Sequence, residues 1–131
     1  MCSSITSNVI KRHYDNIKIE KIECRFNSPI LNLRNFNNFV KNSILTIYLD
    51  KLKLIAGENI KTKLTSLDIG CGKGGDLFKL RKNGITHLVC ADISKKSLDE
   101  CVRRYNKMTI NDNKCDEQFD AEFIRLDCSS V

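Results

Sequence analysis

This sequence is poor in proline and glycine, and its cysteines lack the spacing of a metal site. Pro29 is the only proline, and the 131 residues include 6 glycines. The 7 cysteines are an odd number and contain no C-x-x-C pair, which argues against a disulfide framework and against zinc. We therefore predict that the protein holds no metal, and we interpret most cysteines as small buried hydrophobic residues in a reducing compartment.

Long apolar runs are also missing. No segment approaches the length of about 18 apolar residues that a membrane helix needs, and the N-terminus has no apolar signal region. We therefore expect a soluble, intracellular protein with no membrane partner. The net charge of +6 favours an anionic partner such as RNA, a nucleotide or phosphate.

Hydrophobic periodicity predicts alternating helices and strands after an irregular start. Residues 1–31 are polar, and we interpret them as an irregular N-terminal arm. Predicted helices span residues 33–55, 75–83 and 94–108, and predicted strands span residues 64–69, 86–93 and 121–127. Residues 56–63 and 109–119 are predicted loops, Gly84 suits the end of the second helix, and Ser94 suits the N-cap of the third.

The order of these elements predicts an α/β fold. Strands that alternate with helices pair in parallel through right-handed crossovers, so we expect three parallel strands. Three strands are half of a doubly wound sheet. We therefore expect residues 32–131 to be a partial domain that is truncated after its third strand, with one sheet face lacking neighbours.

The segment SLDIGCGKGGDLFKL, residues 66–80, carries most of the glycines. Gly70, Gly72, Gly74 and Gly75 lie between a predicted strand and a predicted helix. The missing side chains let the backbone turn tightly and let a ligand come close, and the following helix offers free N–H groups. We predict a ligand site at the carboxyl end of this strand.

Two ligand classes fit this loop. Gly70, Gly72 and Gly75 match G-x-G-x-x-G, and Asp92 follows about 20 residues on, as in dinucleotide sites. However, Asp68 precedes the loop inside the strand, where its carboxylate would repel a pyrophosphate and attract a cation. S-adenosylmethionine (SAM) carries a positive sulfonium and a positive amino group. We therefore favour SAM over NAD, which stays the alternative.

Two further aspartates support SAM. Asp92 ends the second predicted strand, and its two carboxylate oxygens can accept both ribose hydroxyls. Asp127 ends the third predicted strand and is placed for the adenine edge. Three carboxylates at three consecutive strand ends fit a nucleoside with a positive tail.

Four segments resemble a known family. They are LDIGCGKGGDLFKLRKNGITHLVCADIS from residue 67, LRNFNNFVK from residue 33, AEFIRLDCSS from residue 121, and HYD at residues 13–15. Together they resemble the eukaryotic mRNA cap guanine-N7 methyltransferases from about residue 12 to the end. The resemblance implies the N-terminal half of a Rossmann-like class I SAM-dependent methyltransferase fold, preceded by a helix. The family's catalytic domain continues further, so we expect a fragment.

The resemblance implies methyl transfer from SAM to N7 of the guanine in the GpppN cap of mRNA, in the nucleus. Cofactor-binding residues are then Lys41, Asp68, Gly70, Gly72, Asp92 and Asp127. Cap- or RNA-binding residues are Asn37, Asn38, Lys73, Lys79 and Arg104. Whether an activator subunit is needed stays open.

The helical pattern partly agrees with these roles. At about 100° per residue, Asn37, Asn38 and Lys41 share one helix face, so Phe36 and Phe39 lie opposite and are expected to be buried. The cations Lys73, Lys79 and Arg104 suit a triphosphate bridge.

No catalytic residue is expected, because guanine N7 has a free lone pair at neutral pH and needs no general base. The enzyme would act by aligning N7, the methyl carbon and sulfur. Two alternatives stay open beside this reading: another SAM-dependent methyltransferase, and a non-catalytic RNA- or cap-binding module.

Overall fold

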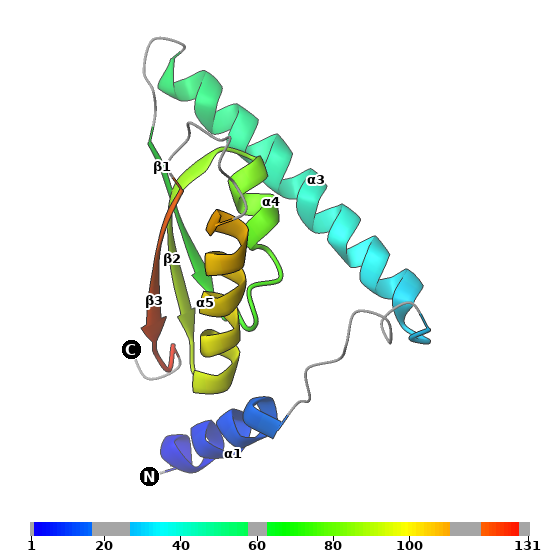
Figure 1. The fold of residues 1–131 in the computed structure, drawn as a ribbon, viewed down its shortest axis with the longest axis vertical. Helices are drawn as coiled ribbons and strands as arrows, with labels where there is room; N and C mark the ends of the chain where they lie inside the picture. The colour runs from blue at the N-terminus through cyan, green and yellow to red at the C-terminus, as the bar shows by residue number, and fades with distance from the viewer. Residues whose placement is uncertain (1, 17–26, 58–62, 111–118, 129–131) are drawn as a thin grey trace. The chain divides into compact units, whose positions relative to one another are not determined.

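The structure is a computed structural model of the chain, and it describes residues 2–16, 27–57, 63–110 and 119–128. The chain forms two compact units. One unit contains residues 1–17 and 63–131, and the other contains residues 18–62. Figure 1 labels the helices and strands of both units.

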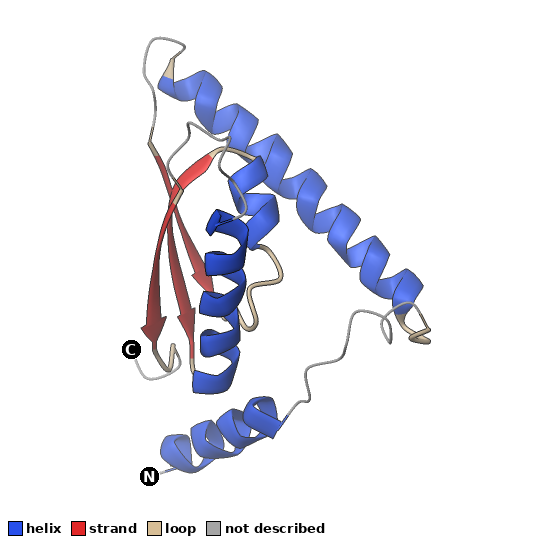
Figure 2. Ribbon diagram, viewed as in Figure 1, coloured by secondary structure: helices blue, strands red, loops and turns tan. Residues whose placement is uncertain are grey.

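The first unit contains a three-stranded parallel sheet. Its strands are β1 (Leu64–Ile69), β2 (Ile85–Asp92) and β3 (Asp120–Arg125), in the spatial order β1-β2-β3. The crossover helices α4 (Leu77–Lys82) and α5 (Lys95–Ile110) lie on the same face of this sheet (Figure 2). The predicted α/β order with parallel pairing is confirmed, and β1 has the predicted bounds.

The core of this unit lies between the sheet and the two crossover helices. Leu88 and Cys90 of β2 are fully buried, and Leu80 of α4 and Leu98 of α5 are buried as well. The other sheet face is open at β1, where every second residue is exposed and Leu67 keeps 60% of its surface accessible. This agrees with the expected sheet face without neighbours.

The N-terminal region differs from the prediction. Residues 1–31 were expected to be irregular, but α1 (Cys2–Asn16) is a helix and belongs to the same unit as the sheet. Apolar periodicity missed it because its sequence, CSSITSNVIKRHYDN, is mostly polar; two of its few apolar residues, Val9 and Ile10, are exposed. Residues 17–26 lie outside the described part. The division of the chain at residue 31 stays a prediction.

Two other boundaries also moved. β3 ends at Arg125, so Asp127 lies beyond the strand that it was expected to end. α5 continues to Ile110, so the predicted loop 109–119 begins later, and residues 111–118 lie outside the described part. Helix ends are the least predictable feature of a pattern, because periodicity does not show where the last turn stops.

The second unit contains α3 (Leu31–Ala56), which confirms the helix predicted at 33–55. The expected burial of its aromatic face is wrong, because Phe36 and Phe39 are 62% and 69% exposed. Within α3 only Leu49 is buried. No helix among the described residues combines the length and apolar character that crossing a membrane requires.

Candidate functional site

The glycine loop after β1 has a backbone that needs glycine at three positions. Gly70, Gly72 and Gly74 have φ angles of 72°, 54° and 70°, in the left-handed region that other residues rarely adopt. The N–H groups of Gly70 and Cys71 both donate to the carbonyl oxygen of Ala91, at 2.8 and 3.1 Å. The loop is therefore fastened to the end of β2.

Asp92 organises the carboxyl edge of the sheet. Its Oδ2 accepts the N–H of Gly72 at 2.8 Å, and its Oδ1 accepts the N–H of Ser94 at 2.8 Å. Its backbone oxygen accepts the N–H of Leu126 at 3.1 Å. One residue thus joins the glycine loop, the start of α5 and the exit from β3. Each carboxylate oxygen has two lone pairs, so Asp92 keeps acceptor capacity for a ligand.

The glycines of the loop differ in whether a side chain would fit at their positions. A Cβ added at Gly74 would come within 2.6 Å of Leu77 Cδ1 and 2.7 Å of Cys101 Sγ, so helix packing excludes a side chain there. At Gly70 and Gly75 an added Cβ would meet nothing within 4 Å. In the dinucleotide fingerprint the third glycine permits close helix packing. Here Gly74 has that role and the matched Gly75 does not, which counts against the NAD alternative.

Lys79 lies directly above the end of the loop. Its Nζ donates to the Gly75 oxygen at 3.0 Å and to Asp76 Oδ1 at 2.7 Å, and the side chain is only 15% exposed. A cation is thereby held beside the open glycine positions. Lys73 is a half-buried residue of the same loop. For both lysines, the contact with the cap stays a prediction.

Arg104 lies midway along α5 in an ion-pair cluster. Its Nε donates to Glu100 Oε1 at 2.8 Å, and Arg103 Nε donates to Glu100 Oε2 at 2.6 Å. These hydrogen bonds, chiefly the one from Arg103, lower the pKa of the buried Glu100 to about 2. The structure therefore gives Arg104 a structural partner, and its predicted contact with RNA stays untested.

Three of the predicted ligand residues lie on α3. Asn37, Asn38 and Lys41 are all exposed on this helix. They belong to the second unit, and their contacts with SAM and the cap stay predictions.

Helix α1 is attached to the start of α5 by a polar contact. Ser94 is fully buried, and its hydroxyl donates to Asp15 Oδ1 at 2.6 Å. The same hydroxyl oxygen accepts the N–H of Ser97 at 3.1 Å, which confirms Ser94 as an N-cap. The hydrogen bond from Ser94 holds the pKa of Asp15 below its usual value. Asp15 belongs to the HYD segment, so the structure gives that segment a role in positioning.

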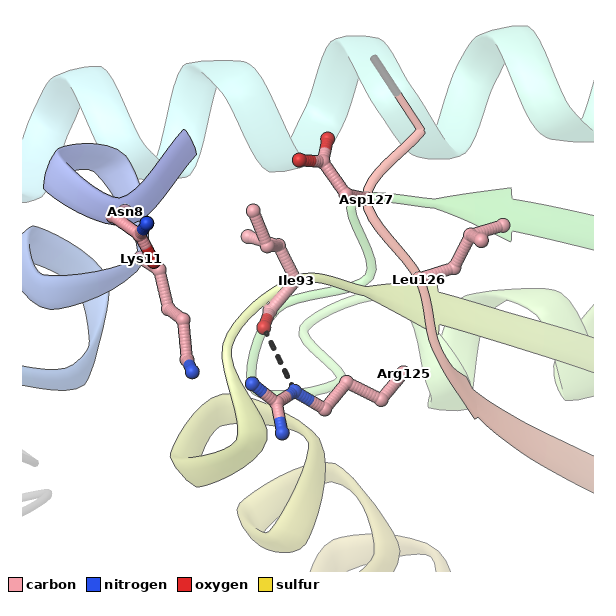
Figure 3. Close-up of a pocket in the computed structure, with 6 residues that line it drawn as sticks. All are labelled: Asn8, Lys11, Ile93, Arg125, Leu126 and Asp127. Carbon is pink, nitrogen blue, oxygen red and sulfur yellow. Dashed lines mark hydrogen bonds between the residues drawn. The ribbon is translucent and has the colours of Figure 1, made fainter. Parts of the chain in front are cut away.

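A pocket opens beside the ends of β2 and β3. It has a volume of about 360 Å³ and is lined by Asn8, Lys11, Ile93, Arg125, Leu126 and Asp127. Figure 3 shows these side chains and the hydrogen bond from Arg125 Nε to the Ile93 oxygen, at 3.5 Å. Asp127 lies here, at the edge where the adenine was predicted to bind.

Three cysteines that the sequence pattern did not bring together form a cluster behind the loop. Cys71 of the loop, Cys90 of β2 and Cys101 of α5 are buried, and their sulfur atoms lie within 4.8 Å of one another. Hydrogen bonds among the thiols, led by those to Cys101, raise the pKa of Cys71 and Cys90, while the same bonds lower the pKa of Cys101. Spacing rules missed the cluster because its members come from three separate elements.

Comparison with known proteins agrees with this geometry. A family model described as the mRNA (guanine-N(7))-methyltransferase domain matches residues 3–131. The mRNA cap guanine-N(7) methyltransferase of Drosophila melanogaster is 35% identical over 127 residues, covering 95% of this chain and 29% of that protein. The mRNA cap guanine-N(7) methyltransferase 1 of Oryza sativa subsp. japonica is 34% identical and is matched over 28% of its length. The chain thus spans less than a third of these curated relatives.

A solved structure bears on the fold. The crystal structure of magnesium protoporphyrin IX methyltransferase from Synechocystis PCC 6803, with bound SAH, aligns with a TM-score of 0.60 at 13% identity. The alignment covers 95% of this chain and 53% of that one, and it confirms the Rossmann-like methyltransferase fold class. Since the family model matches nearly the whole length of this chain, the protein belongs to the mRNA (guanine-N(7))-methyltransferase domain family.

Proposed function

We propose that this protein acts in methyl transfer from SAM to N7 of the cap guanine of mRNA. The observation that carries the proposal is the family match over residues 3–131, which includes both the LRNFNN helix and the glycine loop. The named relatives are cap guanine-N(7) methyltransferases, and they are much longer than this chain. Their activity is therefore an inference for this protein, and so is its nuclear location.

The residues at the loop suit SAM as the methyl donor. When bound, SAM supplies a methyl group on a positively charged sulfur. Gly70 and Gly75 border open space, so a ligand can approach the backbone there. Asp68 lies near the end of β1 and Asp92 at the end of β2, and the Asp92 carboxylate accepts the N–H of Gly72 in the loop. The carboxylates favour a cationic tail and ribose hydroxyls, and they disfavour a pyrophosphate.

The chain's own contribution to catalysis would be alignment. Guanine N7 is a free nucleophile at neutral pH, so no side chain has to remove a proton. Lys79, held above the loop by Asp76, and Lys73 offer positive charge to the cap triphosphate. Asn37 and Asn38 are proposed to hold the guanine in line with the methyl carbon and sulfur, which lowers the entropic part of the barrier.

The first test is a titration of the full chain with SAM and with GpppG by calorimetry. Asp92→Ala should weaken SAM binding by about 10-fold to 100-fold, since a hydrogen bond to a charged group contributes about 1.5–3 kcal/mol. GpppG binding should change much less. Asp92→Asn removes the charge and keeps one acceptor oxygen, so it retains only one of the two bonds from the Gly72 and Ser94 N–H groups and should fall between the wild type and Asp92→Ala. Asp99→Ala is the matched control, because Asp99 is an exposed carboxylate on α5 that forms an ion pair with Lys95 on the same helix.

The outcomes separate the alternatives. Equal loss of SAM and GpppG binding in Asp92→Ala would remove the ribose role from Asp92. Binding of GpppG or RNA without any SAM binding would identify a non-catalytic module. SAM binding without GpppG binding would point to a methyltransferase with another substrate.

A further inference from the structure

We propose that Cys71, Cys90 and Cys101 form a binding site for a thiophilic divalent cation of the Zn²⁺ type, behind the glycine loop. The three sulfurs come from a loop, a strand and a helix, and each lies within 4.8 Å of the other two. Neither the proposed methyl transfer nor the SAM site uses these thiols, so the inference is independent of the proposed function.

The distances suit one ion. A zinc–sulfur bond is about 2.3 Å, so three sulfurs around one zinc ion stand roughly 3.8–4.0 Å apart. The largest separation here is at most 4.8 Å. Bringing the three sulfurs around one ion therefore shortens any one separation by at most about 1 Å.

The donor chemistry points to a soft metal. All three donors are thiols, and thiolates select zinc and other soft ions over Mg²⁺ or Ca²⁺, which prefer oxygen. The Cys90 and Cys101 side chains are fully buried and Cys71 is 7% exposed, so the three ligands would shield a bound ion from solvent. Three protein ligands leave a fourth position for water or a small anion.

The loop offers a route to this site. Cys71 is the only one of the three ligands that keeps any exposed surface, 7%, and it lies between Gly70 and Gly72. Cys101 Sγ faces the same loop, since a Cβ on Gly74 would come within 2.7 Å of it. A bound ion would tie the loop to β2 and α5, and it would hold the backbone that surrounds the proposed SAM site.

The test uses the reduced full chain and a variant in which the other four cysteines, Cys2, Cys24, Cys115 and Cys128, are replaced by serine. Both proteins are titrated with Zn²⁺ against a chromophoric chelator. We expect about one equivalent to bind to each, because the three clustered thiols are unchanged. Adding Cys90→Ser to the four-serine variant should weaken binding at least about tenfold, as loss of one ligand removes a metal–sulfur bond.

A second measurement guards against misfolding of the Cys90→Ser protein. The four-serine variant is treated with an alkylating reagent, with and without Cd²⁺, for the time at which the metal-free protein has become fully modified, and the modified thiols are counted by mass spectrometry. Protection of all three thiols by Cd²⁺ supports the site. Absence of Zn²⁺ binding to the four-serine variant, or alkylation that Cd²⁺ does not slow, would overturn it and leave the thiols as packing groups. Neither result depends on SAM or RNA binding.

Discussion

Gly74 is the position where the glycine loop is most sensitive to substitution. Its φ angle is 70°, and a Cβ there would meet Leu77 Cδ1 at 2.6 Å and Cys101 Sγ at 2.7 Å. A left-handed backbone costs an L-residue about 1–2 kcal/mol. Overpacking of a closely packed core costs about 1–3 kcal/mol more. Gly74→Ala should therefore lower the free energy of unfolding by about 2–5 kcal/mol, a large part of a typical domain's stability of about 5–15 kcal/mol.

The loop contains its own controls for this prediction. Gly70→Ala meets nothing within 4 Å but has a φ angle of 72°, so it should show the backbone cost alone, about 1–2 kcal/mol. Gly75→Ala has neither a positive φ angle nor a nearby atom, so its unfolding free energy should change by less than about 1 kcal/mol. The three variants thus separate backbone strain from steric overlap.

The measurement is urea unfolding of the full chain and the three variants, followed by far-UV circular dichroism. The expected order of destabilisation is Gly74→Ala, then Gly70→Ala, then Gly75→Ala. If Gly74→Ala were no more destabilising than Gly70→Ala, the overlap with Leu77 and Cys101 would be relieved at no cost. The assignment of Gly74 as the packing glycine would then be wrong.

Two more predictions concern α5. Glu100→Gln should lower the free energy of unfolding by about 1–2 kcal/mol near neutral pH. The lowered pKa of Glu100 alone would correspond to a larger loss, but solvent screens its partner Arg103, whose side chain is 62% exposed. The pKa of Glu100 is lowered from 4.5 in the unfolded chain to about 2 in the folded protein. The stabilisation by the Glu100 carboxylate is therefore complete above pH 4.5 and is lost as the pH falls from 4.5 to about 2. In acid titrations of unfolding, the wild type and Glu100→Gln should become equally stable near pH 2. A constant difference down to that pH would contradict the ion-pair assignment. Ser94→Ala removes the N-cap of α5 and should cost about 0.5–2 kcal/mol in thermal unfolding, while raising the pKa of Asp15 toward its usual value in an NMR titration. An unchanged Asp15 titration would refute the contact between α1 and α5.

Local patterns in the sequence were sufficient for several elements. β1 has the predicted bounds, α3 lies within one residue or two of its prediction, and Ser94 caps α5 as expected. These features depend on alternation, helical periodicity and capping, which act between residues close in the chain. The glycine loop was found for the same reason, since its left-handed positions need glycine whatever surrounds them.

Other features depended on contacts that local patterns do not encode. Helix α1 was missed because it is joined to the rest of its unit by contacts between distant residues, such as the hydrogen bond between Asp15 and Ser94, 79 positions apart. Asp92 was predicted as a ribose ligand, but its hydrogen bond from the Gly72 N–H of the loop depends on the pairing of β1 with β2, which no local pattern shows. The burial of Phe36 and Phe39 was predicted wrongly, because a helical stripe shows a face and not what covers it.

The sequence alone determined the order of the elements from α3 onward, the position of the glycine loop and the resemblance to the family. Tertiary structure decided which glycine packs against α4 and that Cys71, Cys90 and Cys101 meet. Parallel strands joined by crossover helices bring the loop, β2 and α5 to one point. The distances between residues of these three elements follow from strand register and helix placement. Residue spacing along the chain therefore could not predict them.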